Sequence, residues 1–406
     1  MATGILSQRA GLWALIVLAT SILYRAYVHN IIFVTIGIGR EIQSIDEFPW
    51  TCTRLQHPLL EGCEDMWLDG QGRKLYATCN SVESRQGWCP GGGKYNVSAR
   101  SHTDHIAVLN IDEPGPDGLY GLRQLKVGGY DDDLDLIAFD VRRVDGRLRF
   151  WLINHRPPVD PTTGESLDAY AIGANSTIEI FDLDDASETL EYVKTIASDA
   201  IISPNNLAVD NDGLGFVITN DHNAKVGTFI ELEFLIGGGS LTYCRSDTGE
   251  CHVAAKKGFS FANGIAQENG LYYVAHSVTG LVTVHKLVGD QLVQVDKIHT
   301  GLPLDNLSLD AEGNLLAAAI PDSITFVKSI ENPRELVAPA TVLAVNGIST
   351  QLGTHGGKGC EVSKLVEDRD AKWLPSSTVA VKDVKSRRLF LGGVVSPFIT
   401  ICEQRI

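Results

Sequence analysis

The stretches "PNNLAVDNDG" (204–213), "FANGIAQENG" (261–270) and "LDNLSLDAEGN" (304–314) repeat one pattern. In each, an asparagine comes before a short alternation of apolar residues, and an acidic turn with glycine follows. A second short strand comes next, namely "GFVITN", "LYYVAH" or "NLLAAA". Alternation with period two is typical of half-buried strands, and Gly, Asn and Asp between such runs are typical of tight turns. The pattern therefore predicts repeated antiparallel hairpins.

A fourth copy, "CEDMWLDGQGRKLYATCN" (63–80), has Glu64 and Asp65 in the asparagine position. The separations are 58 residues between Asn205 and Asn263, and 43 residues between Asn263 and Asn306. One four-stranded propeller blade takes roughly 40–50 residues, so this chain has room for about six blades. No amphipathic helical pattern of comparable length competes after residue 45. We therefore predict an all-β fold, a six-bladed β-propeller with an N-terminal hydrophobic segment.

The predicted propeller covers residues 41–406, and residues 1–40 form the hydrophobic segment. Within that segment, "GLWALIVLATSILY" (11–24) is an uncharged run that follows Arg9. Its length suits the core of a signal peptide and is short for a membrane span. A second apolar run, "IIFVTIGIG" (31–39), follows without a clear small-residue cleavage site. A removed signal peptide and an uncleaved signal-anchor both stay open. Either one predicts the secretory pathway, with the protein membrane-anchored or secreted and the segment available for membrane or lipid association.

The charge balance limits the classes of partner. A formal net charge of −16 argues against nucleic acid and is compatible with oxygen ligands for a hard cation. The same acidity is common in secreted proteins, where it serves solubility.

Eight cysteines fit an oxidising compartment, and their spacing alone does not fix the pairing. Cys52 lies near the start of the folded body and Cys402 near its end. A bridge between them would tie the termini together and stabilise the fold by at most roughly 5 kcal/mol. No C-x-x-C pair occurs, which argues against zinc.

Equivalent positions of propeller blades face the central channel at one end, so distant residues become neighbours there. Each of these asparagines taken singly could equally be a turn residue. Taken together, the oxygen-bearing side chains predict a site for Ca²⁺, which binds about 6–8 oxygens. The predicted ligands are Glu64, Asn205, Asn263, Asp305 and Asn306.

Three asparagines lie in glycosylation sequons. Asn96 and Asn175 lie in polar stretches and are predicted to carry glycans. We expect none on Asn306, because a buried metal ligand cannot carry a sugar.

The motifs "EGCEDMWLD", "NHR", "PNNLAVD", "TNDH", "FANGI", "LDNLSLD" and the terminal "CEQ" occur in this order between about residue 46 and residue 406. In this respect the chain resembles the paraoxonase family, which comprises calcium-dependent lactonases and arylesterases of six-bladed propeller fold. The resemblance implies that the five residues above hold a catalytic calcium and that Cys52 pairs with Cys402.

The resemblance also implies a second, structural calcium deeper in the channel. Its ligands here would be Asp65, Asn206 and the backbone carbonyl of Ile137. The family usually has aspartate where this chain has Asn206. This site therefore loses one negative charge and is expected to bind more weakly.

His155, in "INHR", matches one of two family histidines proposed to generate the attacking hydroxide. Where the family has the other histidine, this chain reads "DDDLDLIAFD". Asp135 is the nearest candidate there, either orienting His155 or acting as base. It belongs to an acidic run, so a structural role is also open. Asp221 and His222 either support the calcium ligands through hydrogen bonds or form a polar turn. "WCPGGGKY" (88–95) occupies the position of the family's flexible active-site loop.

The sequence thus predicts a calcium-dependent carboxylic ester hydrolase of arylesterase or lactonase type, with a small-molecule ester or lactone as substrate. The metal would polarise the carbonyl and stabilise the oxyanion while an activated water attacks. Two alternatives stay open. One is a non-catalytic propeller that calcium stabilises and that binds a partner or acts as a scaffold. The other is a gluconolactonase-like propeller enzyme.

Overall fold

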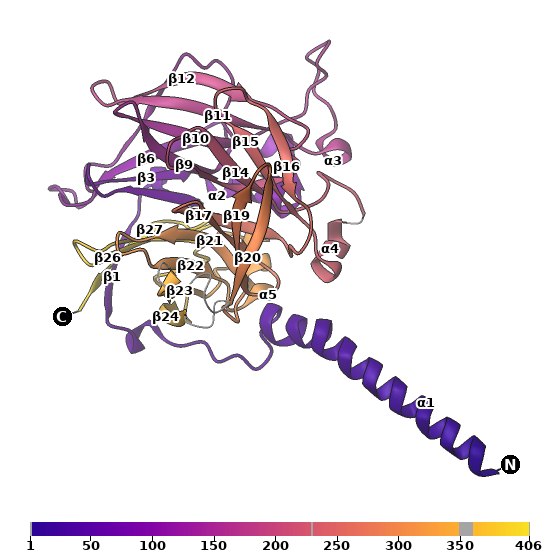
Figure 1. Cartoon of the computed structure of the whole chain (residues 1–406). Coiled ribbons are helices and arrows are strands. Elements are labelled where there is room, and N and C mark those ends of the chain that lie inside the picture. The colour runs from indigo at the N-terminus through magenta and orange to yellow at the C-terminus, as the bar shows by residue number, and fades with distance from the viewer. Residues whose placement is uncertain (1, 229, 349–359, 406) are drawn as a thin grey trace.

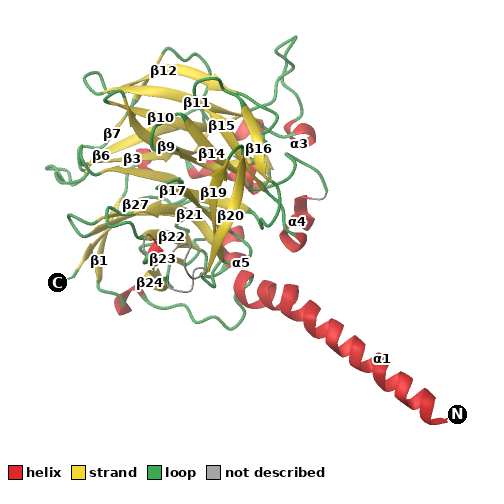
Figure 2. Cartoon of the chain, in the orientation of Figure 1, coloured by secondary structure: helices red, strands yellow, loops and turns green. Residues whose placement is uncertain are grey.

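The computed structural model describes residues 2–228, 230–348 and 360–405. Within these residues, six sheets of four or five strands form the six blades of a β-propeller, as the repeat predicted (Figure 1 and Figure 2). The repeated segments form the first strand of a blade, and neighbouring first strands contact each other all the way round the ring. Each asparagine or acid at the start of a repeat therefore lies at the channel.

The blades follow one another along the chain, and within each blade the strands run antiparallel from the channel outwards. Blade one contains β2 (Asp65–Asp69), β3 (Lys74–Cys79), β6 (His105–Asn110) and β7 (Arg123–Gln124). Blade two contains β9 (Leu136–Val144), β10 (Arg147–Arg156), β11 (Asn175–Asp184) and β12 (Thr189–Ile196), with β8 (Lys126–Gly128) added in parallel at its edge. Blade three contains β13 (Pro204–Val209), β14 (Gly215–Asn220), β15 (Ser240–Arg245) and β16 (Cys251–Ala255).

Blades four to six complete the ring. Blade four contains β17 (Ala262–Glu268), β18 (Leu271–His276), β19 (Leu281–Val288) and β20 (Gln291–His299). Blade five contains β21 (Leu304–Leu309), β22 (Leu315–Ala319), β23 (Ala340–Asn346) and β24 (Glu361–Asp368). Blade six contains β25 (Val379–Asp383), β26 (Arg388–Gly392) and β27 (Ile399–Gln404), and its outermost strand is β1 (Trp50–Leu55).

The ring closes because blade six takes strands from both ends of the folded body. In the antiparallel pair of β1 and β27, Cys52 stands opposite Cys402, and a disulfide joins the two. The predicted bridge is confirmed. It links residues 350 positions apart, so it restricts the unfolded chain strongly.

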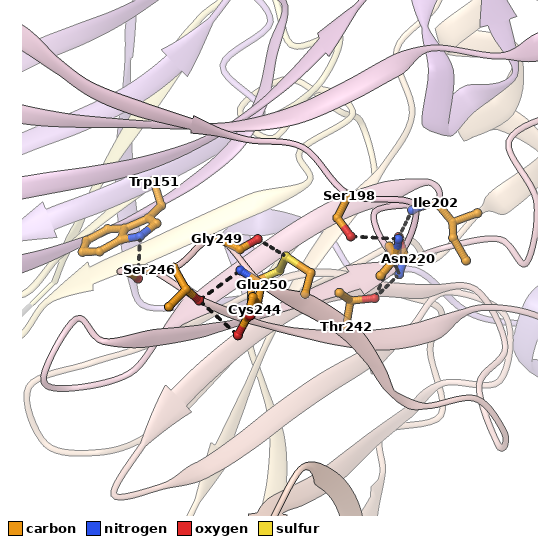
Figure 3. Close-up of a disulfide and its surroundings, with 12 residues drawn as sticks. Trp151, Ser198, Ile202, Asn220, Thr242, Cys244, Ser246, Gly249 and Glu250 are labelled. Atoms are coloured by element: carbon orange, nitrogen blue, oxygen red, sulfur yellow. Dashed lines mark hydrogen bonds between the residues drawn. A yellow bond between two sulfur atoms is a disulfide. The ribbon is translucent and has the colours of Figure 1, made fainter.

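Two further disulfides lie within single blades. Cys63 bonds to Cys79, and Cys244 bonds to Cys251 across the hairpin of β15 and β16 (Figure 3). Cys89 and Cys360 are free thiols. The sequence had left the pairing of these cysteines open.

The core lies between adjacent blades, where the strand faces pack against each other. Blade two meets blade three through apolar side chains that include Trp151, Ile180 and Phe216. The indole nitrogen of Trp151 donates a hydrogen bond to Ser246 Oγ at 3.2 Å, so its one polar atom is satisfied inside this layer (Figure 3).

Short elements cover one end of the channel. They are α2 (Val82–Gly87), β4 (Trp88–Cys89), β5 (Lys94–Tyr95), α3 (Ala169–Ile172), α4 (Ile230–Ile236) and α5 (Ser323–Glu331). Single 3₁₀ turns occur at Ile45–Glu47, Pro58–Leu60, Pro90–Gly92 and Val97–Ala99. Because loops tolerate variation and strands fix their ends, this covered face is where a binding site is expected.

The N-terminal segment forms α1 (Ala2–Leu23), which continues into π-helical turns at Tyr24–Val28 and Asn30–Thr35. Figure 1 shows α1 projecting away from the propeller. Its apolar side chains, for example Trp13 and Val17, are exposed. Thr35 Oγ1 donates to the Val278 carbonyl at 2.7 Å, which attaches the end of the segment to blade four. Among the described residues, no helix combines the length and apolar character needed to cross a bilayer. The signal-anchor stays a prediction.

Candidate functional site: the channel under the loops

A cavity of about 480 Å³ lies at the covered end of the channel. Its floor contains the polar side chains that begin the first strands of four blades, namely Glu64, Asn205, Asn263 and Asp305. Its walls are mainly apolar and come from the covering loops and helices, including Ile137, Phe261, Val278, Ile320, Phe326 and Ile330. An apolar pocket with a few convergent polar groups is the usual form of a small-molecule site.

Two buried carboxylates lie at this floor. Glu64 Oε2 accepts a hydrogen bond from Thr378 Oγ1 at 2.6 Å. Burial, together with the neighbouring Asp305, raises the pKa of Glu64 well above its usual value. Burial likewise raises the pKa of Asp305 to about 7. Without a cation, these two carboxylates cannot both hold their charge at low cost.

Asn263 lies beside Asp305, and its side chain hydrogen-bonds the Asp305 carboxyl and opposes the rise in the pKa of that group. Its side-chain nitrogen donates to Ser277 Oγ at 3.0 Å, whereas its buried oxygen has no hydrogen-bond partner in the described part of the chain. A buried amide oxygen without a partner is rare, and here it belongs to a group that lines the cavity. Two acids and this oxygen fit a divalent cation that prefers oxygen ligands.

The predicted set of metal ligands contains amides as well as acids. In the described residues, no cluster of three or more His, Cys, Asp or Glu side chains is placed to hold a metal. Asn205 lines the cavity and its amide faces Asp221. Calcium accepts carboxamide oxygens readily, so this composition suits calcium better than zinc.

Asn306 is placed differently from the other four expected ligands. It is 2% exposed, and its side-chain nitrogen donates to the Glu64 carbonyl at 2.8 Å. Its oxygen accepts a hydrogen bond from Asn206 Nδ2 at 2.7 Å. The structure thus brings Asn306 to the site but turns its oxygen away from Glu64 Oε1, which lies 3.5 Å from the nitrogen.

His155 lines the same cavity and ends β10 close to its floor. Burial lowers the pKa of His155 to about 3, and the positive charges of Arg85 and Lys225 act in the same direction. The ring is therefore neutral at physiological pH. Its Nδ1 lies 2.8 Å from Ser176 Oγ on the neighbouring strand β11. A neutral, oriented imidazole can accept a proton.

Asp135 does not orient this imidazole. Its carboxylate is bound by Arg100 through Nε at 2.8 Å and Nη2 at 2.6 Å. It contacts His155 only through the backbone, where the His155 N–H donates to the Asp135 carbonyl at 2.9 Å. The carboxylate that we expected beside the histidine is thus held by an ion pair, and Ser176 takes the orienting position.

Asp221 and His222 follow β14 and lie beside the cavity. Asp221 accepts a hydrogen bond from Ser203 Oγ and faces the Asn205 amide. Burial raises the pKa of Asp221, and these contacts oppose the shift. His222 Nδ1 lies 2.8 Å from Glu233 Oε2 of α4, and its ring packs against Phe261. Asp221 therefore contacts a predicted ligand, whereas His222 belongs to the cavity wall.

The loop 88–95 packs closely over this region. A Cβ atom at Gly91 would lie 3.0 Å from Asp221 Oδ2 and 3.9 Å from Asn205 Nδ2. Glycine therefore lets the backbone approach the polar floor.

Sequence reasoning missed Arg85, on α2. This side chain is 3% exposed, and its Nε and Nη2 have no hydrogen-bond partner among the described residues. Its charge lowers the pKa of Glu64, Asp104 and Asp135. It compensates the acidic floor at a distance. No motif marks it, because it lies in the ordinary-looking stretch "SVESRQG".

The predicted glycan sites differ in exposure. Asn96 is exposed and its oxygen accepts a hydrogen bond from the Ser98 N–H at 3.2 Å. Asn175 begins β11, opposite Arg156, and is half-buried. Glycosylation at both stays a prediction.

The groups expected to hold a second calcium lie one level deeper in the channel. Asp65 and Asn206 line a second cavity of about 320 Å³, which extends along the same first strands away from the covered face. The Ile137 carbonyl accepts a hydrogen bond from Thr78 Oγ1 at 3.2 Å. Asn206 directs its nitrogen towards Asp65 and Asn306. These groups do not fit a cation.

The curated proteins that this chain resembles include serum paraoxonase/lactonases. A serum paraoxonase/lactonase 3 from Oryctolagus cuniculus is 33% identical over 37% of this chain and 44% of its own length. The serum paraoxonase/lactonase 3 of Mus musculus is 29% identical over 57% of this chain and 60% of its own length. The chain thus spans about half the length of the curated relatives it matches.

Among solved structures, a gluconolactonase from Xanthomonas campestris is 13% identical and covers 89% of this chain and 93% of its own, with a TM-score of 0.49. That score is too low to support an inference. The family model described as Arylesterase matches residues 171–399, more than half of the chain. This chain belongs to the paraoxonase/arylesterase family.

Proposed function

We propose that this protein is a calcium-dependent hydrolase of small esters or lactones. The observation that carries the proposal is the cavity floor, where two buried carboxylates and an unpartnered amide oxygen lie in one pocket with a neutral histidine. The relatives named as paraoxonase/lactonase are consistent with this reaction class. Glu64, Asn205, Asn263 and Asp305 would hold the ion.

The shape of the cavity supports a substrate with an apolar body and one polar end. The apolar walls contributed by Phe261, Phe326 and Ile330 would bury the acyl chain or ring. The ester carbonyl would then face the polar floor, where a bound cation would offset the negative charge that develops on its oxygen. The volume of about 480 Å³ suits a small molecule rather than a polymer.

Calcium, when bound, would polarise the carbonyl and offset the negative charge that develops on its oxygen. The chain's own contribution is the base. With Nδ1–H donated to Ser176, the lone pair of His155 Nε2 is free to take a proton from the attacking water. His155 then returns that proton to the leaving alkoxide. The loop 88–95 and α5 would exclude bulk water during these steps.

The disulfides bear on the cellular compartment that we propose for the protein. Three disulfides require oxidising conditions, which supports the secretory pathway. The exposed apolar residues of α1 are available for contact with lipid.

Hydrolysis of a panel of γ- and δ-lactones and aryl acetates, with calcium and with chelator, tests the proposal. We expect turnover that chelation abolishes and added calcium restores. Turnover that survives exhaustive chelation would contradict the calcium dependence. Calcium binding without turnover of any ester would favour a non-catalytic propeller.

A further inference from the structure

The deeper level of the channel contains a side chain in the position where a cation is expected. Asp65 and Asn206 lie side by side there and are buried, with 6% and 3% of their surface exposed, and Ile137, whose carbonyl was the third expected ligand, is 7% exposed. Their hydrogen bonds decide which atoms face the space between them.

The orientation of the Asn206 amide is fixed from outside this space. Its oxygen accepts a hydrogen bond from the Leu207 N–H at 2.6 Å. A flipped amide would set two N–H groups against each other, so the nitrogen must point the other way. It points to Asn306 Oδ1, at 2.7 Å, and to Asp65 Oδ2, at 3.5 Å.

The neighbouring amide fixes the same direction independently. The nitrogen of Asn306 donates to the Glu64 carbonyl at 2.8 Å, so its oxygen has to face Asn206. A chain of three hydrogen bonds thus runs from the Leu207 N–H through both side-chain amides to the Glu64 backbone. Reversing either amide would break two of these three hydrogen bonds.

The remaining oxygens at this level also have donors. Asp65 Oδ1 accepts from the Met66 N–H at 2.9 Å, and Oδ2 accepts from the Phe139 N–H at 3.1 Å. The Ile137 carbonyl accepts from Thr78 Oγ1 at 3.2 Å. Each oxygen that would ligate an ion here therefore already accepts a hydrogen bond from the protein.

We propose that the side-chain amide of Asn206 takes the place of a second cation, so that this protein binds one calcium ion and not two. The N–H group, with its partial positive charge, lies 3.5 Å from Asp65 Oδ2, in the position that an ion would take. The single ion at the upper level rests on the proposed function.

The same geometry makes Asn206→Asp a switch to two ions. Aspartate has no N–H to direct at Asp65, and it sets a second buried carboxylate against the first. Such a pair is stable only with a cation between the two acids, and calcium is the ion that accepts oxygen ligands of this kind. Asn206→Ser is the matched control, because it removes the same N–H group but adds no charge.

Calcium content per chain tests the proposal, measured by elemental mass spectrometry after equilibrium dialysis against calcium. We expect one ion in the wild type, two in Asn206→Asp, one in Asn206→Ser, none in Asp305→Asn and one in the double variant Asn206→Asp with Asp305→Asn. In chelator, Asn206→Asp should unfold at a lower temperature than the wild type, and calcium should reverse the difference.

Two ions in the wild type would overturn the proposal, and so would a folded Asn206→Asp protein that binds no more calcium than the wild type. If Asn206→Asp does not fold, the wild-type content decides between one ion and two. An ion-free wild type together with an Asn206→Asp variant that binds one ion would refute the proposed upper site and leave this inference standing.

Discussion

The two levels of the channel contain the same kinds of residue in opposite states. At the upper level, Glu64 and Asp305 are buried acids beside Asn263, whose oxygen has no partner. At the lower level, Asp65 is a buried acid beside Asn206, and hydrogen bonds satisfy the oxygens of both. A carboxylate next to an amide is therefore not enough to define a metal site. What matters is whether protein donors have already taken the oxygen of the amide, as the Leu207 N–H has for Asn206 and no described donor has for Asn263.

The largest effect should follow a change at the upper level. Asp305→Asn removes one of the two acids, so we expect calcium binding to be lost and lactone hydrolysis to fall roughly 10³-fold. Calorimetric titration with calcium and initial rates measure both. Asp104→Asn is a matched control, because burial raises the pKa of Asp104 to about 7 as well, but its side chain does not line the cavity. Equal losses in the two variants would show that calcium binding and hydrolysis do not depend specifically on Asp305.

The loss of the catalytic base should be separable from the loss of calcium binding. His155→Gln removes the proton acceptor and keeps a polar side chain of similar size, so kcat should fall about 10²–10³-fold. Calcium content should not change. If hydrolysis persists at wild-type rates, His155 is not the base. Ser176→Ala serves as the milder companion, since it removes only the hydrogen bond to Nδ1.

A substitution at the lower level of the channel should change the stability of the protein and not its calcium content. Asp65→Asn replaces one of the two oxygens that accept the Met66 and Phe139 N–H groups by a donor. We expect a loss of about 1–3 kcal/mol in the free energy of unfolding, measured with denaturant. Calcium content should stay at the wild-type value. A loss of calcium with Asp65→Asn would show that the lower level holds an ion after all.

The smallest expected effect concerns acid sensitivity, to which two buried histidines of blade four contribute. His276 and His285 are buried, each ring stacks with Phe259, and Nε2 of each lies 2.9 Å from Thr283 Oγ1. Burial lowers their pKa values to about 3 and about 4. Because the unfolded histidines titrate near 6.5, the unfolded state binds more protons below that pH, and stability falls as the pH falls towards 4.

His285→Gln should therefore lose less stability than the wild type between about pH 7 and about pH 6. The expected difference is of the order of 0.5–1 kcal/mol, which follows from one proton fewer taken up on unfolding. Denaturant unfolding of calcium-loaded protein at the two pH values measures it. An unchanged slope would place the acid-sensitive groups elsewhere, with the buried His155 as the next candidate.

Much of the fold could be predicted from the repeat. Asn205, Asn263 and Asp305 start their strands in the same way, and a ring is the arrangement that lets such repeats share one axis. The family motifs also placed the Cys52–Cys402 bridge correctly. Contacts between distant loops left no such pattern. The position of Arg85 depends on packing between segments that no spacing encodes.

The candidate site was predictable in residue type but not in orientation. The sequence placed an amide at Asn306, and only the Leu207 and Asn206 hydrogen bonds decide that its oxygen faces downwards. The same holds for Asp135, whose carboxylate is bound by Arg100, 35 residues away in the chain. An alternating pattern states which face a side chain shares but not which partner it binds.

Anomalous diffraction from crystals grown with calcium tests the central claim most directly. We expect one anomalous peak per chain, between Glu64, Asn263 and Asp305, and no peak between Asp65 and Asn206. An empty upper level, or a peak at the lower level, would contradict it.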